Sequence, residues 1–301
     1  MKRLSKQARS FVGSALGNGN RATLEYTPLL TLVGTRAFWT TYDGGNSVEI
    51  AIYASAPGKK RSLIDVIGSD PDGSGTGGYF PSLVSDGPRL VYGFARVYVP
   101  GNGWPTDCSQ LELGDKGVKV IAGPPYDYNR SSFIPAMPSV MMLDASQGRI
   151  AVVPATWQVP PGDRCAELAV GENGPVEVYD LAGKRLARVV PVGTVEAVAL
   201  SWPQLAVLVR RREGTKAIER YDARTGALLT ATTVSSKVSE ISIGTRGIVY
   251  SAGSSIFLLS GAKPRLVWHS TGAPIGVSIE GSRIAWAVNG RPSLVRALTI
   301  P

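Results

Sequence analysis

Six copies of one short pattern run through the sequence, and this repetition constrains the fold more than any other feature. Each copy has a turn marked by glycine or proline, then a polar residue, then an apolar run. The six runs are TRAFWTT from Thr35, PRLVYGF from Pro88, GRIAVVP from Gly148, PQLAVLV from Pro203, RGIVYSA from Arg246 and SRIAWAV from Ser282. A β-prone segment precedes each run and a third strand follows it. Self-similarity at intervals of tens of residues indicates repeated copies of one supersecondary unit.

Five of the six copies continue through a glycine turn into a fourth strand. These fourth strands are expected at 62–67, 118–122, 185–190, 228–233 and 264–269. Repeated units of four antiparallel strands predict an all-β fold, a six-bladed β-propeller. The blades are expected at about 27–67, 79–122, 139–190, 195–233, 238–269 and 274–301, as one domain over residues 27–301.

The last copy ends one strand short. A propeller covers its open edges by completing such a blade with a strand from the other end of the chain. We therefore expect the N-terminal segment 1–26 to supply the closing strand of the C-terminal blade. Residues 10–16 and 21–26 are the two candidates, and the alternating pattern of RATLEY favours 21–26.

The counts of a few residue types exclude several kinds of site. The chain has one histidine, His269, which argues against His-based metal centres and histidine-dependent triads. The net charge is +9, but the basic residues are dispersed, so no nucleic-acid partner is expected. Arg210–Arg212 is the one basic cluster; a solvated charged loop is the favoured interpretation, and anion binding is the alternative.

Membrane and export signals were sought in the same way. No window approaches 18 consecutive apolar residues, so no transmembrane segment is expected. The basic start MKRLSKQARS has no apolar core region, and a signal peptide is therefore not expected within this chain.

Some outer strands resemble those of known propellers. VEVYDLAGKRLARVV from Val176 and AIERYDARTGALLTATTV from Ala217 resemble the outer half of blades in TolB-like, WD-repeat-like and quinoprotein-like propellers, and GSRIAWAV from Gly281 resembles the second strand of TolB-like blades. The resemblance implies a TolB-like or WD-repeat-like six-bladed propeller. It covers about residues 27–301 as a likeness of repeats and carries no catalytic signature. The tryptophan docking motifs of quinoproteins are absent, so no cofactor is expected.

Four long connections are expected at one face of the predicted propeller, at 67–80, 97–107, 123–138 and 155–174. Long loops on a rigid scaffold often carry binding function, although neutral drift of surface loops is the alternative. The candidate binding residues in or beside them are aromatic and acidic: Tyr79, Phe80, Trp104, Tyr126, Tyr128 and Trp157, with Asp70, Asp72 and Asp107. Such residues suit recognition of a protein, peptide or sugar, while some of the aromatics are expected to pack the loops onto the blades.

Two cysteines, Cys108 and Cys165, fall in comparable long connections of neighbouring blades. A disulfide between them would link two insertions and imply an oxidising compartment. We therefore predict the disulfide and an extracytoplasmic location, periplasmic, cell-surface or secreted; two unrelated thiols are the alternative.

These observations favour a non-enzymatic binding scaffold, expected to be a monomer, that recognises a protein or peptide through the long loops of blades two and three. A carbohydrate-binding propeller and a propeller hydrolase or lyase with carboxylates at its channel are the alternatives. No catalytic residue and no metal ligand is predicted. Asp70 and Asp72 loosely match the start of a calcium loop, but the distal glutamate that such loops need is missing.

Overall fold

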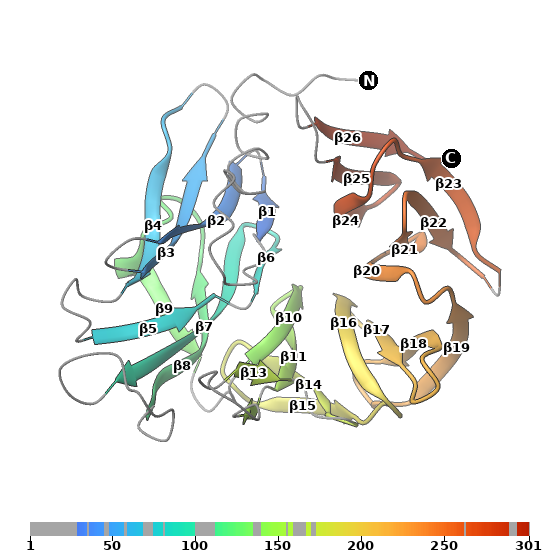
Figure 1. The fold of residues 1–301 in the computed structure, drawn as a ribbon, viewed down its shortest axis with the longest axis horizontal. Coiled ribbons are helices and arrows are strands. Elements are labelled where there is room, and N and C mark those ends of the chain that lie inside the picture. Colours follow the sequence, from blue (N-terminus) through green and yellow to red (C-terminus); the bar gives the residue numbers. More distant parts are fainter. Residues whose placement is uncertain are drawn as a thin grey trace. The chain divides into compact units, whose positions relative to one another are not determined.

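A computed structural model describes residues 29–34, 36–44, 48–56, 59–68, 75–80, 82–99, 112–134, 140–154, 156–158, 167–169, 173–261, 263–288 and 294–300. In these residues the chain is all-β, a six-bladed β-propeller of antiparallel sheets (Figure 1). Internal contacts divide it into two compact units: blades one and two belong to one, blades four to six to the other, and blade three has strands in both.

Blade one is a sheet of the order β1-β2-β3-β4, formed by β1 (Leu30–Val33), β2 (Arg36–Gly44), β3 (Val48–Ser55) and β4 (Ser62–Gly68). Its third strand is buried on both faces, with Ala51 1% and Ile52 0% exposed. Ile50, Ile52 and Ala54 are buried in one core cluster with residues of blade two, because successive side chains of a strand point to opposite faces.

Blade two is built around a long second strand. The strand β7 (Arg89–Val99) pairs through its first half with β6 (Leu83–Asp86) and through its second half with β5 (Gly75–Tyr79). The other edge of β7 pairs with β8 (Glu112–Ile121), which pairs with β9 (Ser131–Ile134).

This arrangement corrects several predictions for blade two. The predicted fourth strand at 118–122 belongs to the third strand, β8, and the fourth strand is β9, inside the region expected to be the loop 123–138. The glycine turn expected before 118–122, GDKG at 114–117, is instead part of β8, which continues through it with a register shift opposite Ala95–Val97, and Gly117 has φ +143°. A bulge and a tight turn use the same residue types, so the local sequence does not separate them. Likewise, β5 lies where a loop was expected.

Blade three has the order β10-β11-β14-β15, with β10 (Val140–Ser146), β11 (Arg149–Pro154), β14 (Val176–Asp180) and β15 (Arg185–Val189). The long connection after β11 contains a hairpin of β12 (Thr156–Gln158) and β13 (Glu167–Ala169). The expected connection is therefore present, but part of it is regular structure.

Blades four and five have four strands each. Blade four consists of β16 (Thr194–Ser201), β17 (Gln204–Arg210), β18 (Lys216–Asp222) and β19 (Leu228–Val234). Blade five consists of β20 (Val238–Gly244), β21 (Gly247–Ala252), β22 (Ser255–Leu259) and β23 (Arg265–His269). The run LAVLV of β17 is buried on both faces. A second strand has a paired strand on each side within its sheet, and other parts of the fold pack against both of its faces.

Blade six is described with three strands, β24 (Pro274–Glu280), β25 (Arg283–Val288) and β26 (Leu294–Thr299). Both candidates for its closing strand, 10–16 and 21–26, lie outside the described residues, so strand closure remains a prediction. Among the described residues, no helix is long and apolar enough to cross a membrane.

Side chains of the innermost strands link consecutive blades at two positions along the strand. At one position, Asp144 Oδ2 accepts a hydrogen bond from the Leu200 N–H (2.6 Å), and Ser242 Oγ accepts one from the Ile279 N–H (3.3 Å). At a second position, Glu240 Oε2 accepts a bond from the Val277 N–H (3.0 Å). These bonds satisfy backbone groups that the inner edge of each blade would otherwise leave without a partner inside its own sheet.

Glu240 makes this link with an ionisable group, so the link responds to pH. Burial raises the pKa of Glu240, and the hydrogen bonds from the Val277 and Gly276 backbone partly oppose that shift. An acid whose pKa is raised by folding stabilises the fold fully below its unfolded pKa, and this stability is lost as pH rises through the folded pKa. We therefore expect Glu240→Gln to gain in melting temperature relative to the parent as pH rises from 4 to 8. Glu280→Gln, at an exposed site on β24, is the control; the same trend in both variants would contradict the assignment.

Candidate functional site

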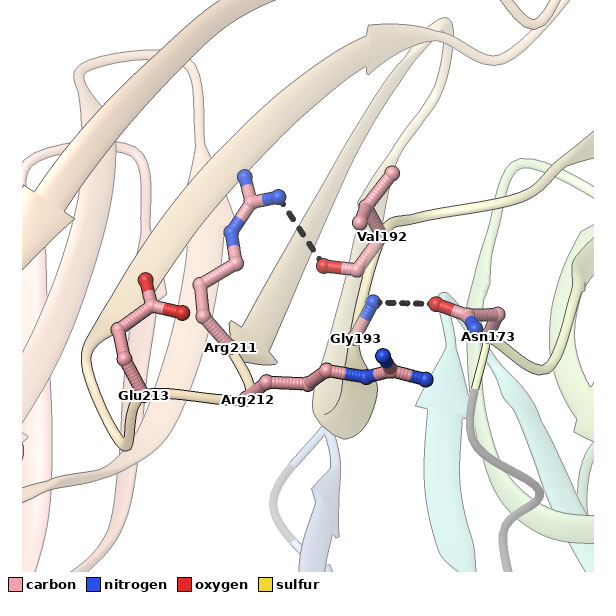
Figure 2. Close-up of a pocket in the computed structure, with 6 residues that line it drawn as sticks. All are labelled: Asn173, Val192, Gly193, Arg211, Arg212 and Glu213. Atoms are coloured by element: carbon pink, nitrogen blue, oxygen red, sulfur yellow. Dashed lines mark hydrogen bonds between the residues drawn. The ribbon is translucent and has the colours of Figure 1, made fainter.

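A pocket of about 400 Å³ lies where three connections of blades three and four meet (Figure 2). It is lined by Asn173, Val192, Gly193, Arg211, Arg212 and Glu213. Asn173 precedes β14, Val192 and Gly193 join β15 to β16, and the two arginines begin the β17–β18 turn. Successive strands run in opposite directions, so second-to-third connections and connections to the next blade lie at the same end of the blades. All three connections that line the pocket are of these two kinds.

One wall of the pocket is a backbone bridge between Asn173 and Gly193. Asn173 Oδ1 accepts a hydrogen bond from the Gly193 N–H (2.8 Å), and the Asn173 N–H donates to the Gly193 carbonyl (2.9 Å). Gly193 has φ +126°, and a Cβ at this position would lie 2.4 Å from the Arg210 carbonyl oxygen. Only glycine lets the β15–β16 connection approach β17 this closely.

Arg211 forms the back of the pocket and is held from two sides. Its guanidinium donates to the Val192 carbonyl (3.0 Å) and forms an ion pair with Glu219 of β18. Glu219 is buried and also accepts a hydrogen bond from the Tyr221 hydroxyl. Burial, and then that bond, raises the pKa of Tyr221, which keeps the phenol protonated as a donor. Arg211 is therefore a fixed, largely compensated cation.

Arg212 is exposed, and its guanidinium reaches across the pocket toward Asn173, while Glu213 lies at the other end (Figure 2). The Glu213 carboxylate accepts a hydrogen bond from the Thr215 hydroxyl (2.8 Å). Its own backbone N–H, then the Thr215 hydroxyl, lower the pKa of this carboxyl. Arg210, the third member of the run, instead pairs with Glu196 (2.8 Å). The three consecutive arginines thus have three different surroundings.

The arrangement suits a planar anion. A guanidinium presents several N–H donors in one plane and matches a carboxylate with two parallel hydrogen bonds. The Arg212 guanidinium lies beside the Asn173 side chain, and Glu213, the acid in the lining, is at the far end. Sequence reasoning favoured a solvated loop for Arg210–Arg212 and missed Asn173 and Gly193. Their local signals, Asn-Gly at 173–174 and the glycine after Pro191-Val192, indicate turns only.

Among the residues predicted to bind, Phe80 belongs to the core. It is 1% exposed, and its ring meets Tyr92 edge to face at 5.7 Å between centroids. This position corrects its assignment to a binding face, because the ring packs against Tyr92 of β7. Tyr79 ends β5, and Trp157 lies in the middle of β12.

Tyr126 and Tyr128 lie at the other end of blade two from the one predicted. They belong to the β8–β9 connection, a third-to-fourth connection, which adjoins the β6–β7 turn: the Tyr126 hydroxyl donates to the Pro88 carbonyl (2.7 Å). Tyr126 also meets Phe38 edge to face at 4.8 Å. The Tyr128 ring covers Lys119, whose Nζ lies 4.0 Å from the ring centroid. Both rings therefore pack the connection onto the blades.

The remaining predicted residues, Asp70, Asp72, Trp104, Asp107, Cys108 and Cys165, lie outside the described residues. Within the part of the chain that is described, no group of three or more His, Cys, Asp or Glu side chains could hold a metal ion. The single histidine, His269, ends β23, where its Nδ1 lies 3.1 Å from the Ser255 hydroxyl on the neighbouring strand.

Comparison with known proteins finds likeness in fold alone. No protein-family profile and no curated protein sequence matches the chain. Similar solved structures include a gluconolactonase from Xanthomonas campestris, with 13% identity over 91% of this chain and 95% of that chain and a TM-score of 0.49. They also include the β-propeller domain of the Trilobed protease from Pyrococcus furiosus (9% identity, 89% and 93% covered, TM-score 0.45) and BamB from Moraxella catarrhalis (8%, 90% and 82%, 0.41).

Proposed function

We propose that this chain is a non-enzymatic binding propeller of the TolB-like or WD-repeat-like kind, which recognises a protein or peptide partner. The observation that carries the proposal is the arginine pocket, in which Arg212 points toward Asn173 and Arg211 and Gly193 complete the lining. We propose that this pocket binds a carboxylate of the partner, either an acidic side chain or a free C-terminus. The net charge of +9 favours the approach of an acidic segment.

The lining of this pocket supports binding over the two alternatives. A sugar site commonly offers an aromatic platform, and none of the six lining residues is aromatic. Hydrolysis of a glycosidic bond needs two carboxyl groups at a defined separation, and Glu213 is the one acid among these six.

The long connections of blades two and three remain part of the proposal. Trp104 and Trp157 stay proposed as aromatic contacts for a partner, together with Asp70, Asp72 and Asp107. A disulfide between Cys108 and Cys165, and with it an extracytoplasmic location, stays a prediction.

Replacement of Arg212 by alanine tests the pocket. The probe is a short synthetic peptide ending in two glutamates with a free C-terminus, measured by calorimetry at low salt. We expect Arg212→Ala to weaken binding about tenfold, since a charge-assisted hydrogen bond is worth about 1.5–3 kcal/mol and exposure reduces this. Arg212→Lys keeps the charge but loses the planar guanidinium, so its affinity for the peptide should lie between those of the parent and of Arg212→Ala.

Arg210→Ala is the matched control, because Arg210 belongs to the same run but pairs with Glu196 away from the pocket. Its affinity for the peptide should stay within about twofold of the parent. The same peptide with glutamines and an amidated end should not bind. Equal loss in the Arg210 and Arg212 variants would show a diffuse charge effect and overturn the site.

A further inference from the structure

The outer strand of blade four, β19, presents an open sheet edge. In the order β16-β17-β18-β19 it pairs with β18 on one side, and in the described residues no strand pairs with its other side. Its first four residues are exposed, with Leu228 54% and Leu229 52% accessible. An open edge offers unpaired N–H and C=O groups to any extended chain.

The composition of β19 does not protect this edge. Its sequence LLTATTV has no charged residue and no proline, and leucine, threonine and valine suit an added strand. The outer strands of the neighbouring blades differ: β15 carries Arg185 and Arg188, and β23 carries Arg265 and His269. Charged residues on an edge are a common way to prevent strand pairing, so their absence from β19 sets this strand apart within its unit.

The geometry of β19 favours addition along its second half. The register shifts once, between Arg220 and Tyr221 of β18, and then runs without interruption from Thr230 opposite Arg220 to Val234 opposite Lys216. A regular, unbulged segment keeps the outward N–H and C=O groups evenly placed for a ladder. Immediately beyond it, Lys237 is exposed.

We propose that the edge of β19 binds an extended segment of a partner protein by strand addition, antiparallel to β19, with an acidic residue of that segment placed against Lys237. Antiparallel pairing then puts the acid at the N-terminal end of the segment. Backbone hydrogen bonds provide the contact, and alternate side chains pack beside Thr230, Thr232 and Val234.

A second copy of this chain fits the edge less well. Two-fold antiparallel pairing of β19 with itself would place Lys237 of each copy beside Thr225 of the other, next to Arg224. Arg224 is already paired with Asp222 (2.6 Å), so Lys237 would gain no acid of its own there, and the two chains each carry +9. An acidic segment meets the same edge with the opposite charge.

Peptide titration tests the proposal. The probe is an acetylated, amidated peptide with two glutamates followed by alternating threonine and valine, and the control is the same composition with the glutamates at the other end. We expect the first peptide to bind the parent protein and the second to bind about threefold more weakly, the effect of one exposed ion pair. Lys237→Glu should reverse this order for the two peptides. A version of the first peptide with lysines in place of the two glutamates should bind Lys237→Glu more tightly than it binds the parent.

A double variant, Thr230→Lys with Thr232→Lys, reproduces the charged edge of β15. We expect it to lose at least about tenfold in affinity, with its melting temperature and circular dichroism unchanged. Failure of the first peptide to bind the parent, unchanged affinity in the double variant, or dimerisation through β19 in sedimentation experiments would each overturn the proposal.

Discussion

Replacing Asp65 by leucine is expected to destabilise the protein by about 3–5 kcal/mol, because it leaves the Lys119 ammonium buried without its counter-ion. The two side chains are 5% and 9% exposed, and Lys119 Nζ lies 3.4 Å from Asp65 Oδ2. The Tyr92 hydroxyl donates to the same oxygen (2.8 Å), and burial above all raises the pKa of Tyr92, so this phenol stays a donor. Equilibrium denaturation in urea measures the change.

The double variant Asp65→Leu with Lys119→Met is the decisive control. A buried ion pair replaced as a whole by apolar side chains of similar size often costs little, so the double variant should regain most of the lost stability. Tyr92→Phe, which removes one hydrogen bond, should cost about 1 kcal/mol. If Asp65→Leu and the double variant were equally stable, Lys119 would not depend on Asp65.

Gly193→Ala should also be strongly destabilising, by about 2–4 kcal/mol, and should abolish peptide binding at the arginine pocket. The added methyl group would lie 2.4 Å from the Arg210 carbonyl oxygen and 3.0 Å from Val209, so backbone must shift, and φ +126° is unfavourable for alanine. The shift would separate Gly193 from Asn173 and open the wall of the pocket. Thermal unfolding and the peptide titration measure both effects.

Gly214→Ala is the matched control for backbone strain. Gly214 lies in the turn after Arg211 with φ +83°, and a Cβ there meets nothing within 4 Å. This variant should lose only about 1 kcal/mol, from conformation alone. Equal losses at the two glycines would mean that close contact at Gly193 adds nothing to the conformational strain.

Much of the architecture could be predicted from local patterns. Apolar runs such as LAVLV of β17 report burial on both faces, which is a property of the strand itself. Gly183 and Gly226 mark turns between third and fourth strands, as expected, with φ +82° and +76°. The six-bladed fold follows from these signals because each blade repeats them.

The errors occurred where one local signal allows two structures. GDKG at 114–117 became a bulge inside β8 because the long partner strand β7 continues to pair beyond it. That shift moved Tyr126 and Tyr128 to the other end of the blade. Phe80, an aromatic residue in an expected loop, became core because β5 and β6 both pair with β7 and bring its ring against Tyr92.

Local patterns predict the all-β repeat, the second strands and most of the turns, since these depend on residues close together in the chain. The candidate site depends instead on tertiary contacts. Asn173, Gly193 and Arg211 are far apart in sequence, and they meet because the connections at one end of blades three and four converge. The different surroundings of Arg210 and Arg211 also depend on Glu196 and Glu219, which neighbouring strands bring to them, and no local pattern carries that information.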